Sequence, residues 1–285
     1  MSAFWRRFLG GAIERKYEIL EEIARGGMSV IHRARHRQMD IVVALKILLP
    51  QFTAKRRALE DLIKDKQIEG EVAALLDHPN IVRTYEYGRD GDRYYFAMEY
   101  IDGMDVRRMI DTGDETLTRL ALKIMLDTTD ALAYLHARKI IHRDICPGNI
   151  VVNSAGEPKL IDFGLAIFKS ASVKRIGERA GTPSYMSPEQ VRGMEVDERS
   201  DIYSWGMTMY KMATGRLPFQ AEGSISSMSQ HLNVDAPPPS DLAPTVTRKV
   251  EKVIMRAVER DPARRYQTMR ELQAELKQVR RIWSE

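Results

Sequence analysis

The secondary-structure pattern of this 285-residue chain changes near residue 104, and that change limits the folds it can adopt. Before this point, apolar and alternating runs predict strands, including Tyr17–Ala24, Val30–Arg35 and Ile41–Leu48. Asp90-Gly91, between two further strand-like segments, is a hairpin signal. A helix is predicted over Ala54–Leu76, where apolar residues recur at helical spacing. The N-terminal part is therefore expected to hold mostly strands and one main helix.

After residue 104 the pattern becomes helical. Further helices are predicted over Ile202–Ala213, Thr247–Arg260 and Met269–Ile282. Because strands and helices are separated along the chain, we predict an α+β fold with two lobes that meet near Glu99–Asp105. A cleft between two lobes is a common place for a small ligand. One long amphipathic helix is predicted from an apolar face, formed by Leu117, Leu120, Ile124, Thr128, Ala131 and Leu135.

Composition and charge exclude several classes of protein. The net charge of +4 is mild, and aromatic and basic residues are not interleaved, so we expect no nucleic-acid partner. No apolar stretch approaches the roughly 18 residues that span a bilayer, so we expect no transmembrane segment in this chain. The single cysteine excludes an intramolecular disulfide and suits a reducing compartment, which predicts a cytoplasmic location. Membrane anchoring by sequence outside this chain stays open.

The N-terminal extension, Met1–Lys16, is short, basic and aromatic, and it lacks the features of a signal peptide. We interpret it as a short helix packed on the neighbouring lobe, or as a frayed terminus. Binding to an anionic membrane surface is the alternative.

One loop carries more chemistry than any other stretch of the chain. The segment His142–Asn149 reads HRDICPGN, and it places the carboxylate of Asp144 five positions before the carboxamide of Asn149. This spacing can set a proton acceptor beside a hydroxyl nucleophile and an amide oxygen beside a metal ion. Phosphoryl transfer needs both, because its transition state requires positioning and charge neutralisation. The loop resembles the catalytic loop of protein kinases.

The resemblance extends from about Tyr17 to about Arg280, and it is to bacterial-style (Hanks-type) Ser/Thr protein kinases. It implies the bilobal protein kinase fold, with an antiparallel β-sheet and one main helix in the N-lobe and mostly α-helices in the C-lobe. We expect an N-terminal extension at residues 1–16 and a kinase domain at residues 17–283. Within that domain we expect the N-lobe at about 17–98, the hinge at 99–105 and the C-lobe at about 106–283.

The activity that the resemblance implies is transfer of the γ-phosphate of ATP to Ser or Thr hydroxyls of proteins, including autophosphorylation in trans. Asp144 would accept or orient the proton of the substrate hydroxyl. Asn149 and Asp162, the latter in Asp162-Phe163-Gly164, would bind Mg²⁺, with Mn²⁺ as an alternative. Magnesium prefers oxygen ligands, and an Asp with an Asn supplies them.

A single lysine, Lys46, interrupts the apolar run Ile41–Leu48, and burying it without a partner would be costly. The resemblance implies that Glu69 is the partner and that the pair holds Lys46 on the α- and β-phosphates. Glu71 is a second candidate partner, and an outward-facing Lys on an edge strand is the alternative without function. The resemblance places further residues around ATP, namely Ala24, Gly26, Gly27, Ser29, Ile31, Ala44, Met98, Glu99, Ile101, Asp105 and Val151.

The segment Gly181–Glu189 resembles the peptide-binding end of a Ser/Thr kinase activation segment. The resemblance implies a hydrogen bond from Thr182 toward Asp144. It also implies an ion pair between Glu189 and Arg265. Asp201 would brace the catalytic loop from a buried helix.

Arg143, next to the catalytic Asp144, indicates control by phosphorylation, because an Arg there can pair with a phosphate on the activation loop. Ser170 and Ser172 are the candidate phosphosites. The alternative is that the loop is not phosphorylated and that its basic residues are simply solvated.

Cys146 departs from the family pattern, which has a Lys there that donates to the γ-phosphate. Losing one such donor from a preorganised site costs about 2.7–4 kcal/mol of transition-state stabilisation. We favour an active Ser/Thr kinase; the alternative is an ATP-binding pseudokinase or very slow kinase that acts as a scaffold or allosteric partner. A redox switch at Cys146 is disfavoured, because a thiol beside Asp144 is expected to have a raised pKa. Gly148 replaces the Glu that is common in kinases preferring basic substrates, so that preference is not expected.

Overall fold

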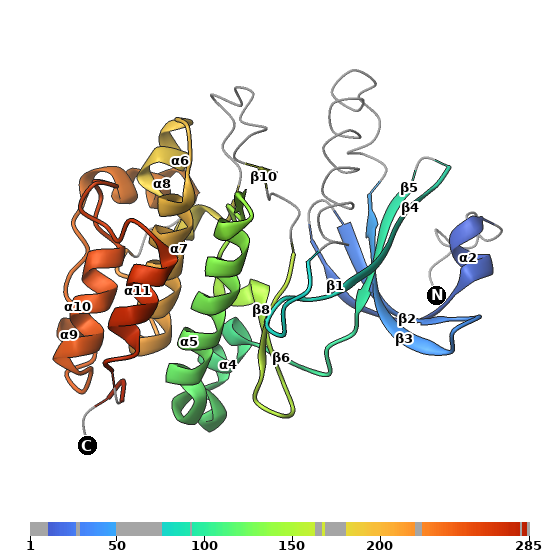
Figure 1. The fold of residues 1–285 in the computed structure, drawn as a ribbon, viewed down its shortest axis with the longest axis horizontal. Coiled ribbons are helices and arrows are strands. Elements are labelled where there is room, and N and C mark those ends of the chain that lie inside the picture. Colours follow the sequence, from blue (N-terminus) through green and yellow to red (C-terminus); the bar gives the residue numbers. More distant parts are fainter. Residues whose placement is uncertain are drawn as a thin grey trace. The chain divides into compact units, whose positions relative to one another are not determined.

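The computed structural model divides into two compact units, which Figure 1 shows as ribbons. Unit 1 comprises Met1–Asp77 and Val82–Asp102, and unit 2 comprises His78–Ile81 and Gly103–Glu285. Several predictions fall outside the described residues: the helix over residues 54–75, and Gly27, Glu69, Glu71, Phe163, Gly164, Ser170 and Ser172. The structure describes residues 11–26, 29–49, 76–91, 93–162, 167–168, 181–219, 224–279 and 281–283.

Unit 1 contains a five-stranded sheet in which every neighbouring pair of strands is antiparallel. The strand order is β1-β2-β3-β5-β4. Gly91, with φ at 61°, stands between the last two strands, so the predicted hairpin is confirmed. The bounds are β1 (Tyr17–Arg25), β2 (Ser29–His36), β3 (Ile41–Leu48), β4 (Thr84–Asp90) and β5 (Arg93–Glu99).

A short helix, α2 (Ala12–Lys16), covers one face of this sheet. Ile13 on α2 and Tyr17 after it are each 1% exposed, within a cluster of apolar side chains from β2, β3 and β5. The carboxylate of Asp90 accepts hydrogen bonds from the backbone N–H groups of Ala12 and Ile13, which satisfies the start of the helix. The interpretation of the extension as a short packed helix is confirmed for these residues.

Unit 2 is mostly helical. Its helices are α4 (Val106–Thr112), α5 (Glu115–Ala137), α6 (Pro188–Arg192), α7 (Glu198–Thr214), α8 (Ser224–Asn233), α9 (Pro239–Leu242), α10 (Arg248–Ala257) and α11 (Met269–Leu276). Short strands also occur: β6 (Gly103–Asp105), β8 (Ile150–Asn153) and β9 (Pro158–Leu160) form one sheet, and β7 (Ile140–Ile141) pairs with β10 (Ile167–Phe168). Two single turns of 3₁₀ helix are η2 (Pro147–Asn149) and η4 (Pro183–Tyr185). The predicted α+β class, with strands in the first part of the chain and mostly helices in the second, is confirmed.

The centre of unit 2 is α7, which is buried along nearly its whole length, as predicted. Trp205 is fully buried, and its indole N–H donates to the hydroxyl of Thr129 on α5 at 2.9 Å. Gly206 allows α7 to approach α10 closely, because a Cβ there would lie 2.8 Å from the side chains of Ala257 and Val258. The buried face of α5 confirms the predicted amphipathic helix.

One helix prediction was too long. The sequence predicts a helix over Met269–Ile282, but α11 ends at Leu276. The apolar spacing continues beyond the helix because Ile282, in an irregular segment, is also buried. The carbonyl of Ile282 accepts a hydrogen bond from the N–H of Thr247 at 2.8 Å. The spacing of apolar residues alone did not distinguish a helix from an irregular C-terminal segment that packs against the fold. None of the described helices combines the length and apolar character that crossing a bilayer requires.

Candidate active site

The loop that the sequence singles out lies between β7 and β8, and a buried carboxylate holds it from behind. Asp201 on α7 is fully buried and accepts hydrogen bonds from the backbone N–H groups of His142 and Arg143, both at 2.8 Å. The ring Nε2–H of His136 also donates to Asp201, at 2.8 Å. The predicted bracing contact is present, and it satisfies two buried donors that would otherwise be unpaired. Sequence reasoning missed His136.

Asp201 keeps its negative charge despite its burial. Burial acts to raise the pKa of this carboxyl group, but the hydrogen bond and charge of His136, with help from His142, lower it on balance below the ordinary value. The charge strengthens the hydrogen bonds that fix the start of the His142–Asn149 loop. Arg143 adopts φ of 69°, a left-handed conformation that is strained for a side chain of this kind. The hydrogen bond from its N–H to Asp201 helps to hold this conformation.

Both oxygens of the Asp144 carboxylate are held by hydrogen bonds. The Nδ2 group of Asn149 donates to Asp144 Oδ2 at 3.1 Å and to the Asp144 carbonyl at 2.8 Å. Thr182 donates to Asp144 Oδ1 from its backbone N–H at 2.8 Å and from its hydroxyl at 2.7 Å. The predicted contact between Thr182 and Asp144 is therefore present. The carboxylate has one defined orientation rather than rotating freely.

Asn149 and Asp162 lie at the same end of the β8–β9 pair of strands. Asn149 directly precedes β8, and Asp162 follows the end of β9, which pairs with β8 in antiparallel fashion. The N–H of Ile161 donates to the carbonyl of Asn149 at 2.9 Å, which ties the two ends together. Asp162 has φ of 63°, outside the usual range for a residue with a Cβ. The Asn149 amide nitrogen serves Asp144, and among the described residues no hydrogen bond to its oxygen is seen. An amide oxygen and a carboxylate are ligands that suit Mg²⁺.

The segment Gly181–Glu189 reaches the catalytic loop through a close backbone approach. Gly181 has φ of 128°, and a Cβ there would lie 2.9 Å from the carbonyl oxygen of Arg143. That same carbonyl accepts a hydrogen bond from the side-chain amide of Gln190, at 2.9 Å. Ser187 and Gln190 also form a reciprocal capping box at the start of α6. Glycine at 181 and glutamine at 190 thus fix this segment against the loop, and sequence reasoning missed Gln190.

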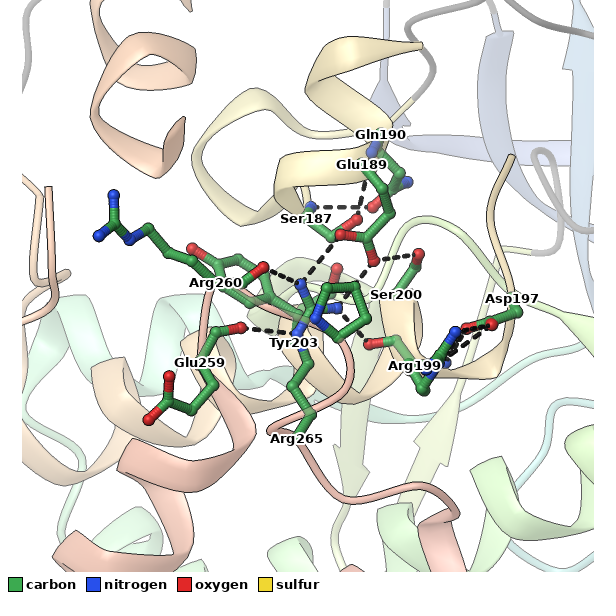
Figure 2. A network of polar contacts seen from close by, with 12 residues as sticks. Ser187, Glu189, Gln190, Asp197, Arg199, Ser200, Tyr203, Glu259, Arg260 and Arg265 are labelled. Atoms are coloured by element: carbon green, nitrogen blue, oxygen red, sulfur yellow. Dashed lines mark hydrogen bonds and ion pairs between the residues drawn. The ribbon is translucent and has the colours of Figure 1, made fainter. Parts of the chain in front are cut away.

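A buried ion pair, drawn in Figure 2, anchors the far end of the same segment. Glu189 accepts from both terminal nitrogens of Arg265, at 2.7 and 2.9 Å, and the two side chains are 9% and 0% exposed. The predicted pair is therefore present. The hydroxyl of Ser200 donates to Glu189 at 2.6 Å. Arg265 also donates to three backbone carbonyls, those of Arg199, Arg260 and Glu259.

The charge state of this pair follows from its surroundings. Burial alone would raise the pKa of Glu189, but the hydrogen bond and charge of Arg265 outweigh it and hold the pKa below its ordinary value. The guanidinium of Arg265 also lies 4.9 Å from the centre of the Tyr203 ring, which adds a cation–π contact. Because all five N–H donors of the Arg265 guanidinium are engaged, the pair anchors α6 to the rest of unit 2.

In unit 1, four of the predicted nucleotide residues, Ile31, Ala44, Lys46 and Met98, share one face of the sheet. Ile31 pairs with Lys46 across β2 and β3, and Ala44 pairs with Met98 across β3 and β5. Directly opposed residues point to the same side, as do residues two positions apart on one strand. Ala24, opposite Ile31, also belongs to this face. The opposite face carries the apolar cluster under α2.

Lys46 is 8% exposed and lies on β3, the central strand of the sheet. The alternative of an outward-facing lysine on an edge strand is therefore wrong. A buried ammonium group requires compensation by a polar partner.

A sequence model of the protein kinase domain matches residues 17–276. The chain belongs to the protein kinase family. Serine/threonine-protein kinase PrkC of Bacillus subtilis is 35% identical over 270 residues, which cover 94% of this chain and 41% of the relative. Serine/threonine-protein kinase PknB of Mycobacterium leprae is 36% identical over 276 residues, which cover 93% of this chain and 43% of the relative. The chain thus spans about two fifths of the length of these relatives.

Residues Glu99 and Asp105, at the two ends of the predicted hinge, take part in local hydrogen bonds. Asp105 caps the N-terminus of α4, accepting from the N–H of Arg108 at 2.9 Å, and its neighbour across the β6–β8 pair is Val151. The N–H of Glu99 donates to the carbonyl of Arg83 at 2.8 Å. In the glycine-rich turn, the N–H of Gly26 donates to the carbonyl of Ser29 at 2.9 Å.

The residue that departs from the kinase pattern, Cys146, is 8% exposed and packs in an apolar cluster. Its sulfur lies 3.9 Å from the hydroxyl oxygen of Thr182, whose single proton is donated to Asp144. Burial first, and the carboxylate of Asp144 second, raise the pKa of the thiol to about 11. This position therefore supplies no charge near neutral pH. The cluster contains Tyr185, Tyr203, Met207, Phe219 and Val258.

Proposed function

We propose that this chain is an ATP-dependent protein kinase that transfers the γ-phosphate to Ser and Thr hydroxyls of proteins, including other copies of itself. The observation that carries the proposal is the carboxylate of Asp144, fixed by Asn149 on one oxygen and by Thr182 on the other. An acceptor carboxylate with a fixed direction is what positioning a hydroxyl nucleophile requires. Two relatives named as serine/threonine-protein kinases support the choice of substrate class.

In this proposal Asp144 orients the substrate hydroxyl and accepts its proton as the new bond to the γ-phosphorus forms and the bond from that phosphorus to the bridging oxygen breaks, with ADP as the leaving group. Thr182 and Asn149 hold Asp144 in place, and Asp201 holds the loop that carries it. Preorganised contacts of this kind lower the barrier because they need no rearrangement when the reaction occurs. The proton leaves the nucleophile for a group that is already in hydrogen-bonding range.

ATP is the proposed phosphoryl donor, with Mg²⁺ as the metal and Mn²⁺ as its alternative. Asn149 and Asp162 would hold the metal, which neutralises phosphate charge when bound. Lys46, paired with Glu69, would bind the α- and β-phosphates. Around the nucleotide we propose Ala24, Gly26, Gly27, Ser29, Ile31, Ala44, Met98, Glu99, Ile101, Asp105 and Val151.

The kinase domain is proposed to comprise residues 17–283, with the N-lobe at about 17–98, the hinge at 99–105 and the C-lobe at about 106–283. Phosphorylation at Ser170 or Ser172 would place a phosphate that Arg143 can pair with. A reducing location such as the cytoplasm suits a chain with one free cysteine.

A second candidate function is that of a pseudokinase that binds ATP and acts as a scaffold. Cys146 favours it, because the family's lysine is replaced by a buried, uncharged thiol that packs against apolar side chains. A site that lacks one cationic donor stabilises the transition state less. Retention of Asp144, Asn149, Asp162 and Lys46 favours the active kinase.

The proposal is tested by incubating the protein with γ-labelled ATP, Mg²⁺ and a generic protein substrate. We expect label on phosphoserine and phosphothreonine, and its loss in Asp162→Asn. Label confined to phosphotyrosine would contradict the proposed substrate class. Nucleotide binding without any transfer would support the pseudokinase.

A further inference from the structure

Arg107, on the first turn of α4, lies against the catalytic loop. Its guanidinium carbon is 3.4 Å from the position that a Cβ on Gly148 would take, and two of its nitrogens are 3.7 Å away. Gly148 belongs to η2, between the catalytic Asp144 and Asn149. The guanidinium of Arg107 therefore lies next to the backbone of this loop, at ordinary van der Waals distance from where a Cβ on residue 148 would be.

The guanidinium of Arg107 is not used by the fold. Its side chain is 64% exposed, and its one ion-pair contact is with Asp105, at 3.9 Å from Nε to Oδ1. It makes no hydrogen bond to any residue that the structure describes. Asp105 meanwhile accepts from the backbone N–H of Arg108. An arginine fork matches a carboxylate through two parallel hydrogen bonds, and this fork is open to solvent.

The positive charge of Arg107 also acts on η4, which belongs to the Gly181–Glu189 segment next to Asp144. Burial raises the pKa of Tyr185, the last residue of η4, and the positive charge of Arg107 opposes that rise. The negative charge of Asp111 on α4 raises the pKa of Tyr185, but Asp111 forms an ion pair with Lys211 at 3.5 Å. Arg107 thus lies against the loop that carries Asp144 and acts electrostatically on η4, while Asp105 and Asp111 each have another partner.

We propose that Arg107 selects protein substrates that carry an acidic side chain close to the phosphorylated Ser or Thr. This inference rests on the proposed kinase activity. The carboxylate of the substrate would take the open hydrogen-bond donors of Arg107 while the hydroxyl lies at Asp144. A basic side chain at the same place would meet a like charge, which disfavours it. Arg107 is a specificity-determining residue here and takes no part in proton or phosphoryl transfer.

The test compares peptides that share one Thr and differ only in Glu or Gln at a single neighbouring position, scanned along the peptide. Binding is followed by fluorescence anisotropy, and transfer from labelled ATP is measured in parallel. At one or more positions, the wild type should prefer Glu by about five- to tenfold. Arg107→Gln should remove the preference, and Arg107→Glu should replace it with a preference for Lys.

Arg108→Gln is the matched control, since it removes the same charge from the next residue of the same helix. It should leave the preference for Glu unchanged. An unchanged preference in Arg107→Gln, or no preference in the wild type at any position, would overturn the inference. If no peptide is phosphorylated, the proposed activity fails, while the binding preference still decides the role of Arg107.

Discussion

Thr182 donates two hydrogen bonds to one oxygen of Asp144, from its backbone N–H at 2.8 Å and from its hydroxyl at 2.7 Å. The two residues are 38 positions apart and come from different segments of unit 2. The contact therefore couples the position of the Gly181–Glu189 segment to the direction of the proposed catalytic carboxylate. Displacing that segment would release Asp144 on one side.

The first prediction concerns this contact. Replacing Thr182 by Val removes the hydroxyl donor but keeps the shape and the backbone N–H. We expect kcat for phosphoryl transfer to fall about tenfold, because a hydrogen bond to a charged group is lost. KM for ATP should change little. Thr182→Ser is the control and should keep most of the activity; equal rates for Val and wild type would mean that the hydroxyl does not orient Asp144.

The second prediction concerns the buried pair of Glu189 and Arg265. Glu189→Ala leaves a guanidinium buried without its charge partner, so we expect the free energy of unfolding to fall by about 3–5 kcal/mol. Urea denaturation measures this. The exposed pair of Arg256 and Glu271 is the comparison, since Glu271→Ala should cost under about 1 kcal/mol. Similar losses for both pairs would contradict the anchoring role.

The third prediction concerns pH. His231 on α8 is fully buried and shares a 2.8 Å hydrogen bond with the Tyr203 hydroxyl, and burial lowers its pKa to about 4. Between pH 6.5 and 4 the unfolded chain therefore binds a proton here that the folded protein does not. Stability should fall as the pH drops through this window, by roughly 2–3 kcal/mol at its lower end.

His231→Phe should flatten this part of the stability profile, measured by denaturant unfolding between pH 7 and 5. Tyr203→Phe is the control, because it removes the hydrogen-bond partner and keeps the histidine. A profile for His231→Phe as steep as that of the wild type would show that another group titrates there.

The fourth prediction concerns the thiol of Cys146, which is 8% exposed with a pKa of about 11. The reactive species is the thiolate, so reaction with a disulfide reagent at neutral pH should be at least about tenfold slower than for a free thiol. Denatured protein provides the reference rate. Rapid reaction of the folded protein would revive the idea of a redox switch at this position.

Some of the site was predictable because sequence motifs carry it. The contacts of Thr182 with Asp144 and of Asp201 with the loop that carries Asp144 were expected from the resemblance to protein kinase motifs. The same resemblance implied the ion pair of Glu189 with Arg265. Strand β3 was predicted with its correct bounds because a run of buried apolar residues is a strong local signal.

Other contacts were not predictable from local patterns. His136 reaches Asp201 across 65 positions, and Tyr203 reaches His231 across 28, with no periodic signal that links them. Tyr17 and Tyr95 both donate to Glu86, and only the fold brings these side chains together. The predicted length of the helix that begins at Met269 was wrong for a related reason, because the spacing of apolar residues indicates which residues are buried and not which backbone conformation they adopt.

The most direct test of the central claim compares phosphoryl transfer by the wild type, Asp144→Asn and Cys146→Lys, using γ-labelled ATP, Mg²⁺ and a threonine peptide. An active kinase predicts measurable transfer by the wild type, a loss of at least about a hundredfold in Asp144→Asn, and an equal or faster rate in Cys146→Lys. No transfer by the wild type together with strong transfer by Cys146→Lys would contradict the claim and identify a pseudokinase.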